Sequence, residues 1–208
     1  MVKRILSTTL LLATLAAPFS TLYAQESKPT TVYNIKGNLP DLRFNLQGVN
    51  GNVTEQVIQG KVAVVFFGYA SCPDICPTTM VELSALKQEI DKTPQHPHLS
   101  DKLQIIFISV DPHRDTPKIL QAYVDAFDNG AIGLTGTTEQ IADIAKRYRV
   151  AYQIGKPKDG AASNDYEVMH AQGVYIFDQQ QKAVYLASNA EDTDLIKEKL
   201  IPLLEKAK

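Results

Sequence analysis

Residues 62–77 read VAVVFFGYASCPDICP and contain both cysteines of the chain. The first six of these residues form an apolar run rich in β-branched side chains, which is typical of a strand buried on both faces of a sheet. Pro77 suits the first turn of a helix, because its φ angle is fixed and its missing N–H is not needed there. The stretch therefore predicts a central strand that leads through a cysteine-bearing loop into a helix.

Other segments carry signals of the same kind. Residues 103–110 form a second buried apolar run, which completes a β-α-β unit with the first strand and its helix. Upstream, residues 43–61 alternate around the turn signal Val49-Asn50-Gly51, as a β-hairpin would. The remaining expected elements are helices over 116–127 and 138–148 separated by a break at 130–136, a short strand over 150–154, strands over 173–177 and 183–187, and a final helix over 193–204.

This order of elements predicts an α/β fold of the thioredoxin-like type. A central mixed β-sheet should be flanked by helices, with an N-terminal β-hairpin and an extra mobile loop over residues 155–164, before His170. The length suits one domain, which we place at residues 41–208. Residues 25–40 mix polar residues, Gly and Pro without sustained periodicity, and are expected to form a flexible linker.

The first 24 residues have the features of a secretory signal peptide. Lys3 and Arg4 precede an apolar run from Ile5 to about Ala17, and Ala24 is the preferred cleavage site. An uncleaved anchor that tethers the domain to the inner membrane is the alternative, although the run is short for a spanning helix. Both interpretations predict export, most simply to the periplasm. In an oxidising compartment the two thiols are expected to form a disulfide unless a metal or a reductant intervenes.

The charge of the chain argues against a nucleic-acid partner. Lys and Arg number 21 and Asp and Glu number 23, so the formal net charge is −2. Cleavage after Ala24 would remove Lys3 and Arg4 and no acidic residue, which leaves −4. A domain of this charge does not attract a phosphate backbone.

The two cysteines lie where function often concentrates in such folds. Backbone N–H groups and the helix dipole at a helix start stabilise a thiolate, the form that binds metals and attacks disulfides. Three residues separate Cys72 from Cys76, whereas thiol-disulfide enzymes of this fold use C-x-x-C. The wider spacing lets both thiolates hold a soft metal ion from one side. A purely stabilising disulfide is the alternative, but so short a loop restricts the unfolded chain little.

Three segments, GYASCPDICP at residues 68–77, SVDPHRDTP at residues 109–117 and Val168-Met169-His170, follow one another along the chain. With these segments, and from Phe44 to the last helix, the sequence resembles the Sco/SenC family of copper chaperones. The resemblance implies that Cys72, Cys76 and His170 bind one copper ion, as Cu(I) or Cu(II). It also implies that the protein assists assembly of the binuclear copper centre in cytochrome c oxidase subunit II.

A metallochaperone rather than an enzyme is therefore expected, with a second function class left open. As a thiol-disulfide oxidoreductase, the protein would use Cys72 and Cys76 as a redox pair to reduce cysteines of the oxidase subunit or of other exported proteins. A thioredoxin-like reductant would then be a further partner. His170 favours the metal, because a pure dithiol enzyme does not need it. A copper sensor or a defence against peroxide is a third interpretation. Membrane contact is expected only if the N-terminal segment is uncleaved.

The chain departs from the family pattern around its histidine. The family usually has Asp-His-Ser, and this chain has Met169-His170-Ala171. The missing carboxylate removes a group expected beside the metal ligand. Met169 could offer a soft thioether to the metal instead. Neighbouring residues of a strand point to opposite faces, however, so Met169 is expected to point away from the metal and to pack in the core.

Other polar residues are weaker candidates. His96 and His98 flank Pro97 in a loop that we expect to be solvated, and His113 occupies a variable position of its motif. Asp111, Arg114 and Asp115 are expected to fix the loop after the second buried strand through ion pairs and capping, close to the cysteine loop. Docking of a partner is the alternative function for these three residues.

Overall fold

The computed structural model covers most of the chain. It describes residues 29–207 except 94–96, 128–129, 158–159 and 161. The predicted signal peptide and His96 lie outside the described residues.

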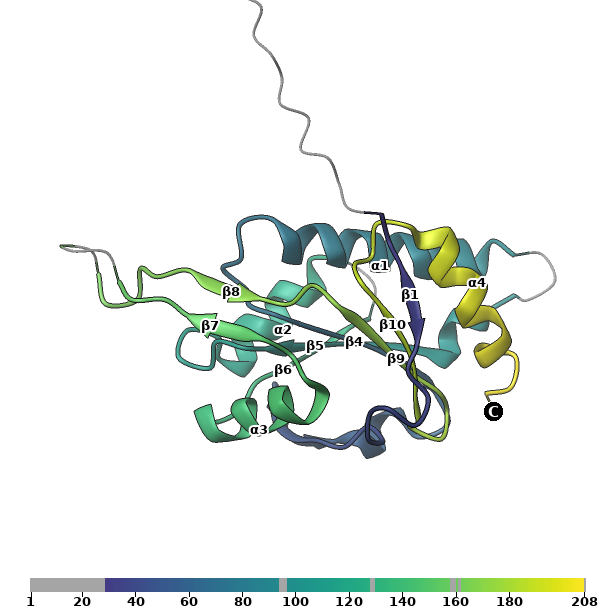
Figure 1. Cartoon of the computed structure of the whole chain (residues 1–208), viewed down its shortest axis with the longest axis horizontal. Coiled ribbons are helices and arrows are strands. Elements are labelled where there is room, and N and C mark those ends of the chain that lie inside the picture. The colour runs from purple at the N-terminus through teal and green to yellow at the C-terminus, as the bar shows by residue number, and fades with distance from the viewer. Residues whose placement is uncertain (1–28, 94–96, 128–129, 158–159, 161, 208) are drawn as a thin grey trace, which may run out of the picture.

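A six-stranded mixed sheet forms the centre of the molecule (Figure 1). Its order is β1-β10-β9-β4-β5-β6, in which β4, β5 and β6 run parallel and β9 runs antiparallel to β4. The expected central mixed sheet is thus confirmed. The strands are β1 (Val32–Asn34), β4 (Val62–Gly68), β5 (Leu103–Ser109), β6 (Ile132–Leu134), β9 (Val174–Phe177) and β10 (Ala183–Ala187).

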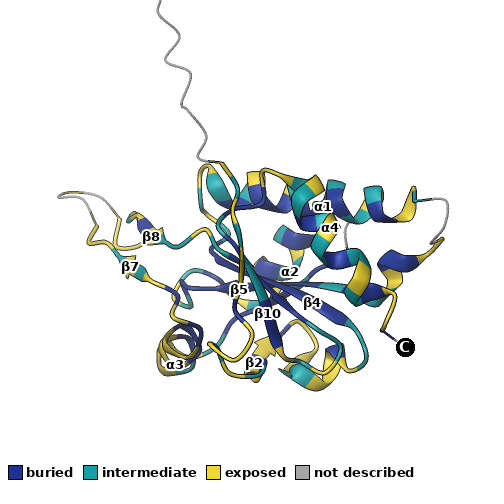
Figure 2. Ribbon diagram, turned by 45° about the vertical axis from the view of Figure 1, so that its right-hand side comes forward, coloured by how far each residue is buried: buried dark blue, intermediate teal, exposed yellow. Residues whose placement is uncertain are grey.

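The apolar run at the start of the cysteine motif is the central strand that the sequence predicts. Every residue of β4 is buried, and the strand lies between β5 and β9. A strand covered on both faces has no polar face, which explains why this segment is continuously apolar. Figure 2 shows the buried strands at the middle of the domain. The cysteine loop therefore starts from a fully buried strand at the middle of the sheet.

Helices cover both faces of the sheet, as expected for a thioredoxin-like fold. The helices α1 and α4 pack against each other on one face, and α3 lies on the opposite face (Figure 1). The helix α2 connects β5 to β6. The helices are α1 (Ile75–Asp91), α2 (Pro117–Asp125), α3 (Thr138–Tyr148) and α4 (Thr193–Leu204), with 3-10 turns η1 (Glu55–Ile58) and η2 (Leu99–Lys102).

Local sequence signals explain where the helices begin. Thr116 accepts a hydrogen bond from the N–H of Ile119, and Pro117 opens α2. Thr137 and Gln140 form a reciprocal capping box at the start of α3. The helix α1 begins at Ile75, two residues before the expected start, so Cys76 lies inside its first turn.

Two hairpins lie outside the six-stranded sheet. The predicted N-terminal hairpin is confirmed as β2 (Asn45–Gly48) and β3 (Gly51–Thr54), and Gly51 adopts a φ of 107° that favours glycine. The second hairpin pairs β7 (Tyr152–Ile154) with β8 (Val168–His170) and extends away from the main sheet (Figure 1). The loop expected before His170 connects these two strands.

The structure corrects the sequence-based expectation at two edges of the sheet. Residues 25–40 were expected to be a linker, but Val32–Asn34 forms β1, which pairs with β10, and Ile35 is buried. The break expected over residues 130–136 contains the short strand β6, which pairs with β5. Both strands are three residues long, so their own pattern is too short to detect and their pairing partners define them.

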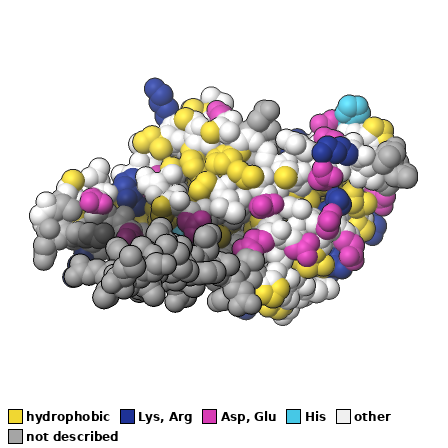
Figure 3. Space-filling view, turned by 90° about the horizontal axis from the view of Figure 1, so that it is seen from above, with side chains coloured by type: hydrophobic (Ala, Val, Ile, Leu, Met, Phe, Trp, Pro, Cys, Tyr) yellow, Lys and Arg dark blue, Asp and Glu magenta, His cyan; other side chains and the backbone are white. Residues whose placement is uncertain are grey.

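Within the described residues, no helix combines the length and the apolar character needed to cross a membrane. On the face drawn in Figure 3, Lys and Arg side chains are scattered and form no continuous patch. This distribution agrees with the slightly negative net charge of the chain.

Candidate metal centre

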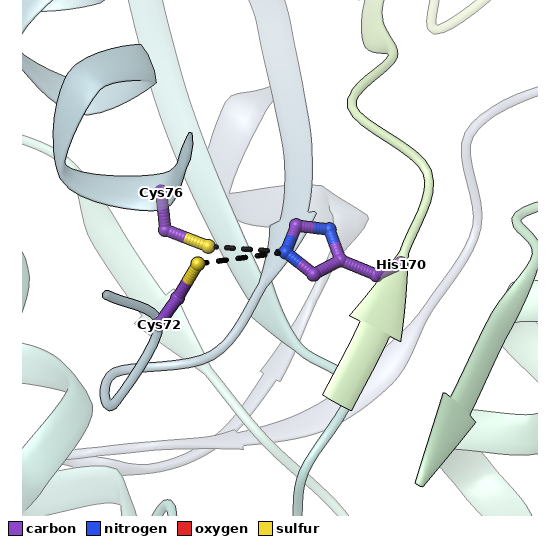
Figure 4. Close-up of side chains that lie close together, drawn as sticks. All are labelled: Cys72, Cys76 and His170. Carbon is purple, nitrogen blue, oxygen red and sulfur yellow. Dashed lines mark hydrogen bonds between the residues drawn. The ribbon is translucent and has the colours of Figure 1, made fainter. Parts of the chain in front are cut away.

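The cysteine loop connects β4 to α1 at the carboxyl end of the central strand. Cys72 is half-buried, and its N–H donates to the carbonyl of Tyr69 at 3.2 Å. Cys76 is fully buried in the first turn of α1. The short loop turns both sulfur atoms toward the imidazole of His170 (Figure 4), while Cys72 is more exposed to solvent than Cys76.

His170 reaches the two thiols from the end of β8. Its Nε2 atom lies 3.3 Å from Sγ of Cys76 and 3.9 Å from Sγ of Cys72 (Figure 4). Its Nδ1 atom lies 3.0 Å from the carbonyl oxygen of Ala171, and since a carbonyl only accepts, Nδ1 carries the proton. Nε2 is then the nitrogen whose lone pair faces the sulfur atoms, which is the tautomer that a metal ligand needs.

Two aromatic rings fix the plane of the imidazole. The rings of Tyr69 and His170 meet edge to face, with centroids 5.7 Å apart and an interplanar angle of 89°. Phe66 packs on the same imidazole at 6.0 Å and 71°. Both aromatic residues belong to the segment that also carries the cysteines. The imidazole of His170, which approaches from the hairpin, therefore packs against an aromatic surface of that segment.

The three side chains make a compact donor set. One ligand atom from each of Cys72, Cys76 and His170 lies within 4.8 Å of the others. Within the described part of the chain, this is the one group of three or more Cys, His, Asp or Glu residues with metal-site spacing. Two thiolates bind soft cuprous ion well, and an added imidazole also makes cupric ion acceptable. The donor set therefore fits copper.

The two thiols share a proton unequally. A hydrogen bond from the thiol of Cys76 lowers the pKa of Cys72 to about 3 despite partial burial. The same hydrogen bond, in which Cys76 keeps its proton, and burial raise the pKa of Cys76 well above its ordinary value. Both cysteines are free thiols in the structure, so the predicted disulfide stays a prediction. A metal ion bound to both sulfur atoms would displace the remaining proton.

The loop after β5 supports the cysteine loop. One carboxylate oxygen of Asp115 accepts the N–H of Ala70 at 2.9 Å and the hydroxyl of Ser109 at 2.6 Å. Burial raises the pKa of the Asp115 carboxyl, whose residue is 1% exposed. Arg114 forms an ion pair with Asp111. The prediction that Asp111, Arg114 and Asp115 fix this loop near the cysteines is confirmed.

The expectation for Met169 is half wrong. Met169 pairs with Gln153 in the β7–β8 hairpin and is 65% exposed, so it does not pack in the core. The alternation argument is sound, since His170 beside it is less exposed. The hairpin stands apart from the main sheet, and its second face meets solvent instead of a core. An acidic residue at position 169 would thus meet solvent, without the cost of a buried charge.

The two other histidines that the structure describes do not join the site. His98 is exposed and precedes η2 with a φ of 63°, and His113 is exposed in the loop after β5. Sequence reasoning missed Tyr69, which packs edge to face on the His170 ring, and Tyr166, whose hydroxyl donates a hydrogen bond to Asp111 at 2.8 Å. Tyr69 lies within the quoted cysteine motif, which was a usable signal, whereas nothing in the sequence around Tyr166 marks it.

Fold and donor set together define a class: thioredoxin-like domains in which two thiols after a central strand meet an imidazole from a distant hairpin. The chain belongs to the SCO1/SenC family, whose model matches residues 33–205. This confirms the resemblance drawn from the cysteine and SVDPHRDTP motifs.

Individual relatives agree with the family match. Protein SCO2, mitochondrial, from Saccharomyces cerevisiae is 40% identical over 136 residues, which cover 65% of this chain and 43% of that protein. The chain spans about half the length, or less, of the first curated relatives it matches.

Solved structures match over nearly their whole length. ScoI from Bradyrhizobium japonicum with copper bound is 34% identical, with a TM-score of 0.65, and the match covers 81% of this chain and 99% of that one. Apo Sco1 from Thermus thermophilus is 31% identical, with a TM-score of 0.70, and the match covers 83% of this chain and 97% of that one.

Proposed function

We propose that this protein binds one copper ion through Cys72, Cys76 and His170 and delivers it during assembly of cytochrome c oxidase. The observation that carries the proposal is the convergence of three copper-type donors, from two distant segments, within 4.8 Å. Copper-bound structures of similar family members support the choice of metal. The binuclear copper centre of oxidase subunit II is the proposed destination.

The geometry suits a protein that must also release its metal. Cys72 is half-buried while Cys76 is fully buried. An incoming thiolate from a partner can therefore approach copper on the Cys72 side while Cys76 still holds the ion. Cu(I) then passes by ligand exchange, and no electron needs to move. Export to the periplasm, with or without a membrane tether, is part of this proposal.

The free dithiol supports a second candidate function. The lowered pKa of Cys72 makes it a thiolate that can attack a disulfide, with Cys76 as the resolving thiol. Such a step would oxidise the pair to a disulfide and transfer two electrons and two protons to the partner's cysteines. A thioredoxin-like reductant would have to restore the thiols.

Mixing experiments separate the two functions. Copper-loaded protein is incubated with the metal-free soluble domain of oxidase subunit II, and copper and free thiols are measured on both after separation. We expect copper to move to the oxidase domain while the thiol count of each protein stays constant. Loss of two thiols from this protein with a gain of two thiols on the oxidase domain, without movement of copper, would instead establish the reductase function.

Replacing His170 by alanine should weaken Cu(II) binding much more than Cu(I) binding. The two thiolates remain and suffice for cuprous ion, whereas cupric ion loses its nitrogen donor. Competition titrations with chromophoric chelators for each oxidation state measure the two affinities. His98→Ala, which removes an exposed histidine outside the site, is the matched control and should change neither. An equal loss of both affinities in the His170 variant would contradict this division between the donors.

A further inference from the structure

Arg114 lies at the junction of three segments that meet at the metal site. Its side chain is 16% exposed, and its Nε donates to Asp111, whose side chain is fully buried in the loop after β5. From this anchored position the guanidinium reaches toward the β7–β8 hairpin. Asp111 also accepts a hydrogen bond from the hydroxyl of Tyr166 at 2.8 Å, so one carboxylate ties both residues together.

The guanidinium of Arg114 donates hydrogen bonds to the backbone of the loop that leads to His170. Its Nη1 atom donates to the carbonyl oxygens of Tyr166 at 2.9 Å and of Asn164 at 3.2 Å. Tyr166 lies four residues before His170, and β8 begins two residues after it. Bonds from one side chain thus help to hold the segment that leads into the strand ending in His170.

The same guanidinium also contacts the cysteine segment. It lies over the ring of Tyr166, at 4.0 Å from the ring centroid, and 5.4 Å from the centroid of Tyr69. Tyr69 in turn meets the His170 ring edge to face at 5.7 Å. Arg114 therefore links the hairpin that carries the nitrogen donor to the segment that carries both sulfur donors.

Polar contacts add to the packing of the hairpin, in which Val168 is buried in the core while Ile154 and Tyr166 pack against it. A cavity of about 400 Å³ lies beneath the loop between β7 and β8, lined by residues that include His113, Arg114, Ile154, Pro157, Ser163 and Tyr166. The remaining nitrogen of the guanidinium, Nη2, is covered and has no hydrogen-bond partner. Arg114 is already committed to the junction, so its place in the structure does not suit direct capture of a ligand from solvent.

We propose that Arg114 is a positioning residue that holds the β7–β8 hairpin in register with the cysteine loop and thereby places Nε2 of His170 over the two sulfur atoms. The inference rests on the proposed copper site and adds a residue that does not touch the metal. It assigns Arg114 control over the nitrogen donor alone. The sulfur donors keep their places without it, because Cys76 lies in a helix and the N–H of Ala70 is held by Asp115.

A lysine at position 114 separates positioning from charge compensation. Lysine keeps the positive charge beside Asp111, but its single nitrogen lacks the planar fork that binds a carboxylate and two carbonyls and stacks on a ring. If Arg114 only neutralises Asp111, Arg114→Lys should behave as the wild type. If Arg114 positions the hairpin, Arg114→Lys should loosen the β7–β8 hairpin while the rest of the domain stays folded.

The test compares Arg114→Lys with Arg147→Lys. Arg147 is a matched control, since it also lies over a tyrosine ring, at 5.8 Å from Tyr148, and donates to a carbonyl, that of Asp41, but it belongs to α3. In metal-free protein, hydrogen exchange should become faster in Arg114→Lys at the N–H groups of Gly155 and Ala171, which close the hairpin through Glu167 and Ala151. Exchange in α1 and β4 should stay as in the wild type.

Copper binding gives the second measurement. Affinity for Cu(II) should fall by about 10- to 100-fold in Arg114→Lys, the range for loss of groups that orient metal ligands, with a weaker nitrogen hyperfine signal. Affinity for Cu(I) should stay unchanged, and Arg147→Lys should change neither. Tyr166→Leu, which removes the stacked ring and leaves the Arg114–Asp111 pair, should shift both measurements in the same direction as Arg114→Lys.

Two results would overturn the inference. One is wild-type hairpin exchange and Cu(II) affinity in Arg114→Lys and Tyr166→Leu. The other is faster exchange throughout the domain with equal losses of Cu(I) and Cu(II), which would make the role purely structural. The exchange measurement needs no copper, so it decides the inference even if the wild-type protein fails to bind or transfer the metal.

Discussion

Replacing Cys76 by alanine is expected to abolish stoichiometric binding of Cu(I). Cys76 is the donor that lies nearest to Nε2 of His170, at 3.3 Å, and it is fully buried. Without it, Cys72 and His170 offer one thiolate and one nitrogen, a donor pair much weaker for cuprous ion than two thiolates. Alanine fits the first turn of α1, so the fold should persist.

Copper per chain after gel filtration, together with a Cu(I) competition titration, measures this effect. Cys72→Ala should lose binding to the same extent, because the two sulfur atoms act as one clasp. Circular dichroism of each variant checks that the domain remains folded. Binding of one Cu(I) per chain by either variant at wild-type affinity would refute the assignment of the two cysteines.

Replacing Gly68 by alanine is expected to damage stability and copper binding together. A Cβ atom at this position would lie 2.6 Å from Sγ of Cys76 and 3.1 Å from the ring of Phe107. The backbone of Gly68 does not have a positive φ, so the contact and not the backbone conformation excludes alanine. Overpacking of this kind costs about 1–3 kcal/mol, and the Cys76 sulfur must move from its place beside His170.

Gly133→Ala provides the matched control for this variant. A Cβ atom on Gly133 would lie 2.9 Å from Leu120, at the contact of β6 with α2, so it overpacks a region without metal ligands. Both variants should lower the midpoint of thermal unfolding, by about 2–12 °C for a cost of 1–3 kcal/mol in a domain of this size. Only Gly68→Ala should also lose copper affinity. Equal copper binding in the two variants would show that the site tolerates the shift of Cys76.

Long or strongly patterned elements were predictable from the sequence. The continuous apolar run gave β4, and α3 and α4 have the predicted bounds because capping residues and periodicity agree there. Two short strands were not predicted, namely β1 and β6. Each is three residues long and is stabilised by its neighbours in the sheet, which depend on tertiary structure.

The sequence predicted which residues bind the metal, but not which contacts hold those residues in place. Spacing identified the cysteine pair as a metal clasp, and the family resemblance supplied His170. The approach of His170 to Cys76 depends on how the β7–β8 hairpin folds back onto the domain. The hydrogen bonds from Arg114 to the backbone of the hairpin loop depend on it too. The prediction that Met169 packs in the core was wrong for the same reason. Alternation along a strand shows which side chains share a face, but it does not show whether that face meets the core or solvent.

The pairing of β1 with β10 limits how far the domain can reach. Because Thr30 and Thr31 already hydrogen-bond to Asn189 and Ser188 beside this pair of strands, only residues 25–29 remain between the predicted end of the N-terminal segment at Ala24 and the folded domain. Fully extended, that stretch spans at most about 18 Å, less than half of what a free linker to residue 40 would allow. If residues 1–24 stay in a membrane, the domain is confined to a layer at the bilayer surface. Copper would then pass most readily to acceptors whose metal site lies at the same height above the lipid.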